Sequence, residues 1–361
     1  MDHMDLRSFY KGKKVLVTGH TGFKGSWLSW VLLELGAKVV GYSKPPVDYR
    51  GNHFNLTRLA EEMSSYEGNT LDVENFTNVV KKEKPEIILH LAAQPIVNVS
   101  YEDPVETFQS NAMGTIHLLE ILRNTDFVRA GIFITSDKCY ENREWLWPYR
   151  ETETLGGHDP YSASKAMAEI AISAYYRSYF QKRGVAIASA RAGNVIGGGD
   201  FAKDRIIPDI VQALDENRSV VLRSPMAVRP WQHVLDVNRG YLSLAMHAYQ
   251  QPAKYSTPYN LAPQGVLNKH NVLYVTKKFV EVLGRGHYEI DPSSAKFHEA
   301  TLLRLDPSKA MEDLKWTPSF STDETISFTA SWYAEFLKSK ENLRAVTLRQ
   351  IQHYLSLNTE L

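Results

Sequence analysis

A turn of three spaced glycines near the N-terminus constrains the fold more than any other feature of this sequence. Gly19, Gly22 and Gly25 stand between an apolar, β-branched run at 14–18 and an amphipathic stretch that follows. Glycine permits a tight turn at the first position, a close approach of backbone to ligand at the second, and close helix–strand packing at the third. The order strand, glycine turn, helix therefore predicts the first unit of a parallel sheet, with a helix N-terminus facing the phosphates of a dinucleotide.

Strand-like and helix-like stretches alternate through the first half of the chain. Further short apolar runs are found at 39–42, 86–90, 131–135 and 185–188. Helices are expected at 74–83, 104–124 and 159–184, the last with Asp159 as N-cap and Gly184 as terminator. This alternation predicts an α/β fold, namely a doubly wound parallel (Rossmann) sheet covered by helices on both faces.

The pattern becomes less regular after about residue 190, where Gly, Pro and Arg are more frequent. We therefore expect a dinucleotide-binding Rossmann domain at 1–189 and a smaller C-terminal α/β lobe at 190–361. That lobe should mainly bind substrate, with some of its segments returning to the first domain.

Composition excludes several classes of function. The 41 basic and 41 acidic residues leave no net charge, which removes a general electrostatic case for nucleic-acid or membrane binding. The single cysteine, Cys139, and 12 histidines without metal-binding spacing predict no metal site. No apolar run is long enough to span a bilayer, and the first residues lack an apolar export signal, so a cytoplasmic protein is expected.

A phenol and an ammonium group share one face of the helix expected at 159–184. Tyr161 and Lys165 are four residues apart, and Ser136 follows a strand about 25 residues earlier. A tyrosine that exchanges a proton with a substrate hydroxyl needs its pKa lowered, which Lys165 and a positive nicotinamide ring would do. Ligands bind at strand C-termini in sheets of this kind, so these side chains are candidate catalytic residues.

Together these motifs resemble the extended short-chain dehydrogenase/reductase family, over almost the whole chain. The segments that carry the resemblance are 18–25, 90–94, 111–115, 161–165, 191–200, 229–231 and 305–309. Longer strings at 19–27, 136–145, 197–200, 202–205 and 229–233 are similar to its CDP-glucose 4,6-dehydratase branch. The resemblance implies a nicotinamide cofactor, a nucleotide-linked sugar as substrate, and a role in deoxysugar and lipopolysaccharide biosynthesis.

The resemblance also implies a sequence of chemical steps. Tyr161, helped by Lys165 and Ser136, would take the proton of the sugar 4-hydroxyl while C4 gives a hydride to NAD⁺. Loss of water across C5 and C6 and return of the hydride to C6 would follow. Asp137 would be the acid for the C6 hydroxyl, which requires burial to raise its pKa. Many relatives have Glu as the C5 base where this chain has Lys138. Lys138 is therefore either the base itself or a stabiliser of the enolate charge.

Cofactor and substrate contacts are likewise implied by the resemblance. The cofactor residues would be Gly19, Gly22, Phe23, Lys24, Gly25, Asn69, Thr70, Leu91, Ala92, Ala93, Asn111, Tyr161 and Lys165. The substrate residues would be Gln94, Ser136, Asn194, Lys203, Arg205 and Arg229, the two arginines as candidates for the diphosphate. Residues 298–302 lack an arginine that many relatives use as a second diphosphate clamp.

Several alternatives stay open. The acidic residue that usually grips the cofactor ribose is replaced by Ser43-Lys44, so the cofactor is NAD, with NADP not excluded. Asn69 stands where Asp commonly contacts the adenine. A dehydratase for another nucleotide sugar, a nucleotide-sugar 4-epimerase and a non-catalytic dinucleotide sensor are the competing functions. The family commonly pairs through two long helices, so a homodimer or homotetramer is expected.

Overall fold

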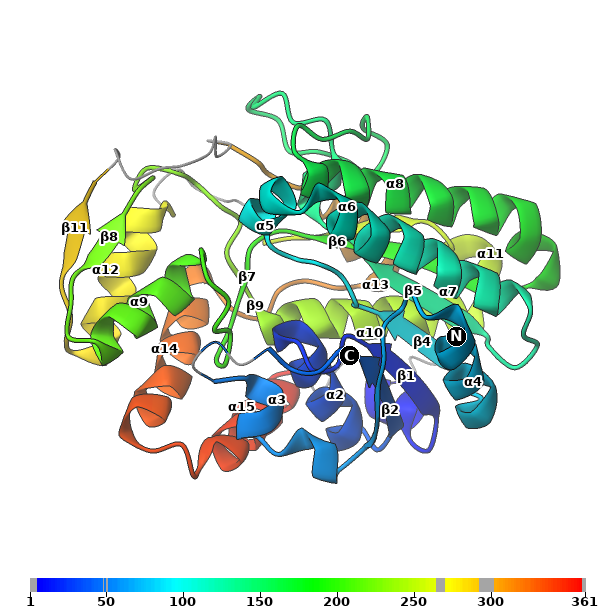
Figure 1. Cartoon of the computed structure of the whole chain (residues 1–361), viewed down its shortest axis with the longest axis horizontal. Helices are drawn as coiled ribbons and strands as arrows, with labels where there is room; N and C mark the ends of the chain where they lie inside the picture. The colour runs from blue at the N-terminus through cyan, green and yellow to red at the C-terminus, as the bar shows by residue number, and fades with distance from the viewer. Residues whose placement is uncertain (1–4, 48, 50, 264–269, 292–301, 359–361) are drawn as a thin grey trace.

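A seven-stranded, entirely parallel sheet forms the centre of the molecule (Figure 1). The computed structural model describes residues 5–47, 49, 51–263, 270–291 and 302–358. The strand order is β10-β6-β5-β4-β1-β2-β3. The strands are β1 (Lys14–Thr18), β2 (Lys38–Ser43), β3 (Ser64–Glu67), β4 (Ile87–His90), β5 (Ala130–Ile134), β6 (Ala186–Ala192) and β10 (Pro258–Leu261). The predicted doubly wound α/β fold is confirmed.

Alternation along each strand produces two cores. In β1, Val15 and Val17 join one apolar cluster, whereas Leu16 joins the other, because successive side chains of a strand point to opposite faces. The same alternation separates Ile132 from Phe133 in β5. Apolar residues on both faces are typical of a parallel sheet that helices cover on each side.

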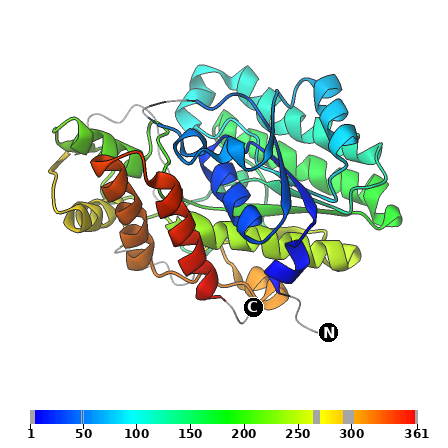
Figure 2. The same cartoon turned by 90° about the horizontal axis from the view of Figure 1, so that it is seen from below.

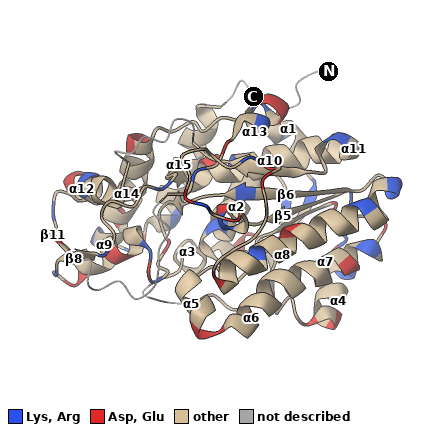
Figure 3. Ribbon diagram, turned by 90° about the horizontal axis from the view of Figure 1, so that it is seen from above, with Lys and Arg blue, Asp and Glu red and all other residues tan. Residues whose placement is uncertain are grey.

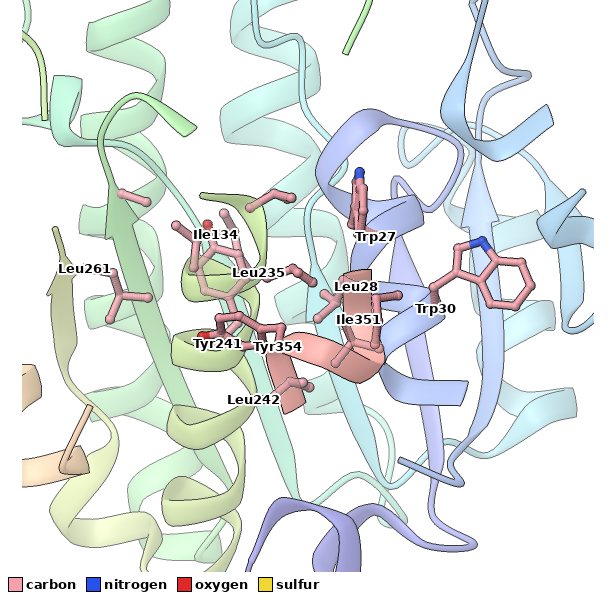
Figure 4. Packing of buried hydrophobic residues seen from close by; sticks show 14 of the residues in the cluster. Trp27, Leu28, Trp30, Ile134, Leu235, Tyr241, Leu242, Leu261, Ile351 and Tyr354 are labelled. Atoms are coloured by element: carbon pink, nitrogen blue, oxygen red, sulfur yellow. The ribbon is translucent and has the colours of Figure 1, made fainter. Parts of the chain in front are cut away.

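Helices cover both faces of the sheet. One face is covered by α4 (Val73–Glu83), α7 (Gly114–Arg123) and α8 (Pro160–Tyr175). The other is covered by α2 (Phe23–Glu34), α10 (Val234–Gln250) and α15 (Leu343–Ser356). Figure 4 shows Trp27 and Leu28 of α2 packing near Leu235 and Leu242 of α10 on this second face.

A smaller lobe lies beside the strand C-termini, and its helices gather at one end of the molecule in Figures 1 and 2. It contains α9 (Ile206–Asp215), β8 (Val220–Leu222), α12 (Val272–Leu283), β11 (Tyr288–Ile290) and α14 (Thr322–Lys338), and β8 pairs with β11. β7 (Val195–Ile196) and β9 (Gln232–His233) pair between the sheet and this lobe. Further short helices are α1 (Leu6–Tyr10), α3 (His53–Leu56), α5 (Val97–Glu102), α6 (Pro104–Phe108), α11 (Pro252–Tyr255) and α13 (Ser308–Leu314).

Two expected long helices contain irregular turns. The helix expected at 104–124 consists of α6, a π-helical turn at Gln109–Met113, and α7. The helix expected at 159–184 consists of α8, a π-helical turn at Tyr176–Phe180 and a 3₁₀ turn at Gln181–Arg183. Its predicted cap and stop are confirmed, since the Asp159 side chain accepts a hydrogen bond from the Ser162 backbone and Gly184 is left-handed with φ 64°.

Acidic and basic residues are interspersed along the helices in Figure 3, as the balance of 41 basic and 41 acidic residues leads one to expect. None of the helices in the described part of the chain has the length and apolar character that crossing a bilayer requires. The division at residue 189 stays a prediction. Later in the chain, β10 pairs with β6 at the edge of the sheet, and α10 packs against β5 and β6.

Candidate active site

A cavity of about 920 Å³ opens at the C-terminal ends of the strands, between the sheet and the smaller lobe. Its walls come from the segments that follow β5 and β6, from the start of α8, and from α9 and β8. This is the edge of a parallel α/β sheet at which ligands bind. The lining includes ten of the expected site residues: Phe23, Lys24, Ser136, Asp137, Lys138, Tyr161, Asn194, Lys203, Arg205 and Arg229.

The glycine turn forms a close-packed cradle beside this cavity. Gly19 has φ 73°, and a Cβ atom there would lie 2.8 Å from the Ala92 nitrogen. A Cβ on Gly25 would lie 2.2 Å from the Gly19 carbonyl oxygen. Gly22 is the N-cap of α2 and offers no side chain to the first amide groups of the helix. These amides and the helix dipole suit a pyrophosphate, so the residues present fit a dinucleotide.

The segment after β4 packs against the glycine turn. The Leu91 backbone N–H donates to the Thr18 carbonyl at 3.2 Å, and the Ala92 N–H donates to Thr18 Oγ1 at 3.1 Å. Ala93 follows directly and is partly buried. The expected cofactor residues of the glycine turn and of the segment after β4 are therefore brought together by Thr18, the last residue of β1.

Two of the expected contact residues, Asn111 and Gln94, form hydrogen bonds that hold the backbone of the segment after β4. Asn111, in the π-helical turn, donates to Ser164 Oγ at 2.9 Å and to the Gln94 carbonyl at 3.1 Å, and its Oδ1 accepts from the Gln94 N–H. The Gln94 amide bonds to Ile96 and to Thr107 Oγ1, and Gln94 lies outside the cavity lining. Both side chains thus fix the segment after β4, which continues into the cavity wall at Pro95.

Asn69 and Thr70 lie beyond the end of β3. Asn69 Oδ1 accepts a hydrogen bond from the Leu71 N–H at 3.1 Å, and the second lone pair of this oxygen could still accept one from an adenine amino group. Thr70 is buried, and its Oγ1 would lie 2.7 Å from a Cβ on Gly114. Thr70 therefore packs closely against the start of α7.

Three candidate catalytic residues share one short turn after β5. Ser136 caps the 3₁₀ turn Asp137–Cys139, and Ser136 Oγ donates to Asp137 Oδ1 at 2.9 Å. Burial raises the pKa of Asp137, while the charges of Lys138 and Arg229 oppose the rise. A proton donor at this position needs a raised pKa, and burial raises the pKa of Asp137 as expected. Lys138 is partly buried and lies on the cavity wall.

Tyr161 and Lys165 lie in the first turns of α8, as expected. Lys165 is buried, and its Nζ lies 3.4 Å from the Ile134 carbonyl and 6.0 Å from the centre of the Tyr161 ring. Burial raises the pKa of Tyr161 to about 12, although contact with the Ser136 hydroxyl and the charge of Arg205 oppose the rise. Lys165 was expected to lower the pKa of Tyr161. The side chains alone raise this pKa, because desolvation of the phenolate outweighs the nearby charges.

Lys24 and Arg205 bring further positive charge to the same site. Burial and the charges of Lys165 and Arg205 lower the pKa of Lys24 to about 7, and its Nζ lies 3.5 Å from the Tyr241 hydroxyl. Arg205 forms an ion pair with Asp200 at 2.8 Å. Because its charge acts on Tyr161, Arg205 lies toward the catalytic end of the cavity.

The remaining expected substrate residues line the cavity with different exposure. Arg229 lowers the pKa of Asp137 by its charge, and its Nη1 donates to the Val228 carbonyl at 3.0 Å. Asn194 is partly buried, and its carbonyl accepts from the Gln232 N–H. Lys203 is exposed at the rim. Of the segment 298–302, residues 298–301 lie outside the described part of the chain.

Several buried polar residues around the site form ion pairs that were not predicted from the sequence. Asp200 holds Arg205, and Glu169 pairs with Arg191 behind the catalytic turn. One signal was available for Glu169, which is four residues after Lys165 and eight after Tyr161, and so lies on the same helix face. Spacing alone does not say that this face is buried.

Comparison with known proteins adds sequence relatives. The family model described as GDP-mannose 4,6 dehydratase matches residues 16–329. A CDP-glucose 4,6-dehydratase from Salmonella typhimurium is 44% identical over 98% of this chain and 99% of that protein. A GDP-mannose 4,6-dehydratase from Vibrio cholerae is 28% identical over 86% of this chain and 91% of that protein.

Solved structures share the fold at lower identity. A UDP-glucose 4-epimerase from Stenotrophomonas maltophila matches with a TM-score of 0.79 and 21% identity, covering 90% of this chain and 99% of that one. A dTDP-glucose 4,6-dehydratase from Bacillus anthracis, solved in complex with NAD, matches with a TM-score of 0.74 and 21% identity, covering 90% and 97%. Epimerases and dehydratases thus share this architecture, and the fold alone does not separate them.

Proposed function

The chain belongs to the GDP-mannose 4,6-dehydratase family, and from this premise we propose that it is an NAD-dependent sugar-nucleotide 4,6-dehydratase acting on CDP-glucose. The product would be CDP-4-dehydro-6-deoxyglucose and water. One observation carries the proposal. The buried carboxyl group of Asp137, whose pKa burial raises, lines the same cavity as Tyr161. Elimination of water needs such a proton donor, whereas hydride transfer alone does not.

Bound NAD⁺ supplies the hydride acceptor for C4 and, after reduction, the donor for C6. In the first half of the reaction Tyr161 takes the proton of the sugar 4-hydroxyl, and the Ser136 hydroxyl hydrogen-bonds the C4 oxygen. Lys165 holds the cofactor ribose and favours the phenolate by its charge. Arg205 adds a second positive charge, which opposes the rise in the pKa of Tyr161 that burial causes.

In the second half the new ketone acidifies the C5 proton. Asp137, whose pKa burial raises, is the group that would give a proton to the departing C6 hydroxyl. Lys138 on the same turn either takes the C5 proton or stabilises the enolate. Ser136, Asp137, Lys138 and Tyr161 line one cavity, so the sugar need not leave between the two halves.

NAD is favoured over NADP by the charge beyond β2. Lys44 follows that strand directly, where a cofactor ribose is bound in folds of this kind. Its Nζ pairs with Glu106 at 2.7 Å. The carboxylate offsets the positive charge that a 2′-phosphate would use, so Lys44 does not act as a phosphate clamp.

A nucleotide-sugar 4-epimerase is the nearest competing function. An epimerase needs the phenol of Tyr161, but it never expels the C6 hydroxyl and so needs no proton donor for that group. Replacement of Asp137 by Asn removes the donated proton and leaves a side chain of similar shape. We expect D137N to lose water elimination. A D137N enzyme that still carries out the whole reaction would favour the epimerase.

The direct test is incubation of the purified protein with NAD⁺ and, separately, CDP-glucose, UDP-glucose, dTDP-glucose or GDP-mannose. Mass spectrometry should find a product lighter by one water from CDP-glucose. Loss of water from another substrate would correct the nucleotide only. A new isomer of unchanged mass would identify an epimerase, and no reaction with any substrate would support the dinucleotide sensor.

We infer that the working unit is a homodimer or homotetramer formed through α7 and α8. Met167 and Ile170 of α8 are exposed, as are Met113 and Tyr179 in the π-helical turns that adjoin α7 and α8, and apolar groups of this size are usual where helices pair. A cytoplasmic location agrees with the one cysteine, Cys139, which is buried and free.

A further inference from the structure

A buried ion pair lies behind the catalytic turn and takes no part in the proposed chemistry. Arg191 Nη2 of β6 lies 2.7 Å from Glu169 Oε2 of α8, and each side chain is 3% exposed. Desolvation of two charges is expensive, so a buried pair is weak evidence for stability. Its hydrogen bonds indicate a different role.

Glu169 holds the beginning of the catalytic turn. The Thr135 hydroxyl donates to Glu169 Oε1, and Thr135 directly precedes Ser136. On the other carboxylate oxygen, Oε2, the Ser189 hydroxyl of β6 donates at 2.8 Å. The two hydroxyls thus bind one carboxylate, but only Thr135 adjoins the residues Ser136, Asp137 and Lys138.

Arg191 holds the end of the same turn. Arg191 Nη1 donates to the Tyr140 hydroxyl at 2.7 Å, and Tyr140 follows the 3₁₀ turn directly. The Tyr140 hydroxyl donates in turn to Asn260 Oδ1 of β10 at 2.8 Å. Both ends of the turn are therefore anchored on the two members of one ion pair.

The same pair is connected to the helix that bears Tyr161 and Lys165. Burial raises the pKa of Glu169, but the charge of Arg191 and the hydrogen bonds outweigh it and hold the pKa below its usual value. The carboxylate is therefore charged. Its charge raises the pKa of Lys165, which opposes the lowering to about 8 caused by burial.

We propose that Glu169 and Arg191 are positioning residues that hold the Ser136–Lys138 turn against the Tyr161–Lys165 helix, so that the elimination groups and the oxidation groups face the same sugar. This inference rests on the proposed two-stage reaction. The catalytic residues come from two separate elements, the turn after β5 and the helix α8. Glu169 belongs to α8 and is hydrogen-bonded to Thr135, which directly precedes the turn. A displacement of about 1 Å between such groups can lower a rate by about a hundredfold.

The test compares Thr135→Val with Ser189→Ala. Each variant removes one hydroxyl that donates to Glu169, and both leave the ion pair intact, so both proteins should fold. We expect T135V to lower kcat roughly tenfold or more, with little change in KM for the sugar nucleotide. Enzyme-bound NADH, seen by its near-ultraviolet absorbance, should accumulate because elimination slows more than C4 oxidation. S189A should change neither kcat nor the amount of bound NADH, and Thr135→Ser should return both to the values of the unmodified enzyme.

The variants are assayed with whichever sugar nucleotide the unmodified enzyme dehydrates. The assay of the unmodified enzyme thus tests the proposed substrate, and the variants test the positioning role. Equal losses of kcat in T135V and S189A would overturn the positioning role and leave the pair a structural one. Unchanged kcat in T135V would overturn it as well. Melting temperatures of the three variants show whether lost stability accounts for any fall in rate.

Discussion

At the level of single residues, Lys138 has two possible tasks, which two substitutions separate. Replacement by Ala removes both the amine and its charge, and we expect C4 oxidation to persist while water elimination falls by roughly 10²–10⁴. Lys138→Arg keeps the positive charge but cannot lose a proton at neutral pH. An active K138R enzyme would therefore make Lys138 a stabiliser of the enolate, and an inactive one would make it the C5 base.

Bound NADH and dehydrated product, measured in the same sample, report the two stages of the K138A reaction separately. Full dehydratase turnover by K138A would contradict both roles. Arrest before C4 oxidation would also count against them, since neither role acts until the ketone has formed.

The residue types at the site were largely predictable, but their environments were not. Helical spacing predicted that Tyr161 and Lys165 share one helix face, and the end of a strand predicted that Ser136 lies near them. The pKa of Tyr161 depends on how completely α8 is buried, which no local pattern encodes. The partner of Arg205, Asp200, was likewise unforeseen, because both lie in an irregular loop.

At the level of elements, the contact between β1 and α2 depends on Gly25. An added Cβ would lie 2.2 Å from the Gly19 carbonyl oxygen and 2.8 Å from the Gly19 carbonyl carbon. Backbone cannot yield as a side chain can, so Gly25→Ala must push α2 away from the glycine turn. We expect a loss of about 1–3 kcal/mol in the free energy of unfolding and loss of NAD binding. Calorimetric titration with NAD⁺ and chemical unfolding measure the two effects.

Gly184→Ala is the matched control, because Gly184 has φ 64° and no atom within 4 Å of an added Cβ. It should cost about 1–2 kcal/mol of backbone strain and leave NAD binding unchanged. NAD binding by G25A as tight as that of the unmodified protein would show that the cradle tolerates displacement of α2.

Five of the seven sheet strands could be predicted from the sequence pattern. The other two, β3 and β10, lack the apolar run on which such a prediction depends. β3, Ser64–Glu67, is a mostly exposed edge strand without the apolar run of a central strand. β10, Pro258–Leu261, begins with proline and is only four residues long. Its place is fixed by pairing with β6, which is a tertiary contact. The π-helical turns at 109–113 and 176–180 likewise leave no mark on apolar spacing.

At the level of the whole molecule, four buried histidines make stability depend on pH. Burial lowers the pKa of His20 to about 4 and those of His53, His90 and His233 to about 3. In the unfolded chain each has a pKa of about 6.5. Their stabilising effect is complete above that pH and is lost as the pH falls below it, because the unfolded state then binds more protons.

Each histidine can add up to about 1.4 kcal/mol per pH unit to this slope. We therefore expect the free energy of unfolding in urea to fall steeply between about pH 6.5 and pH 5. Added salt should not flatten the slope, because desolvation, unlike surface attraction, is not screened. A constant unfolding free energy across this range would contradict the burial of these imidazoles.

The position of β10 and α10 has a consequence for how the protein is made. β6 is paired on one side with β5, but its other neighbour comes some 60 residues later, and α10, which lies against β5 and β6, is in between. A ribosome that adds about 5–20 residues per second therefore extrudes most of the sheet several seconds before its edge and one apolar face are covered. During that interval the nascent chain presents an open strand edge, which is the form most prone to aggregation and the one a chaperone would bind.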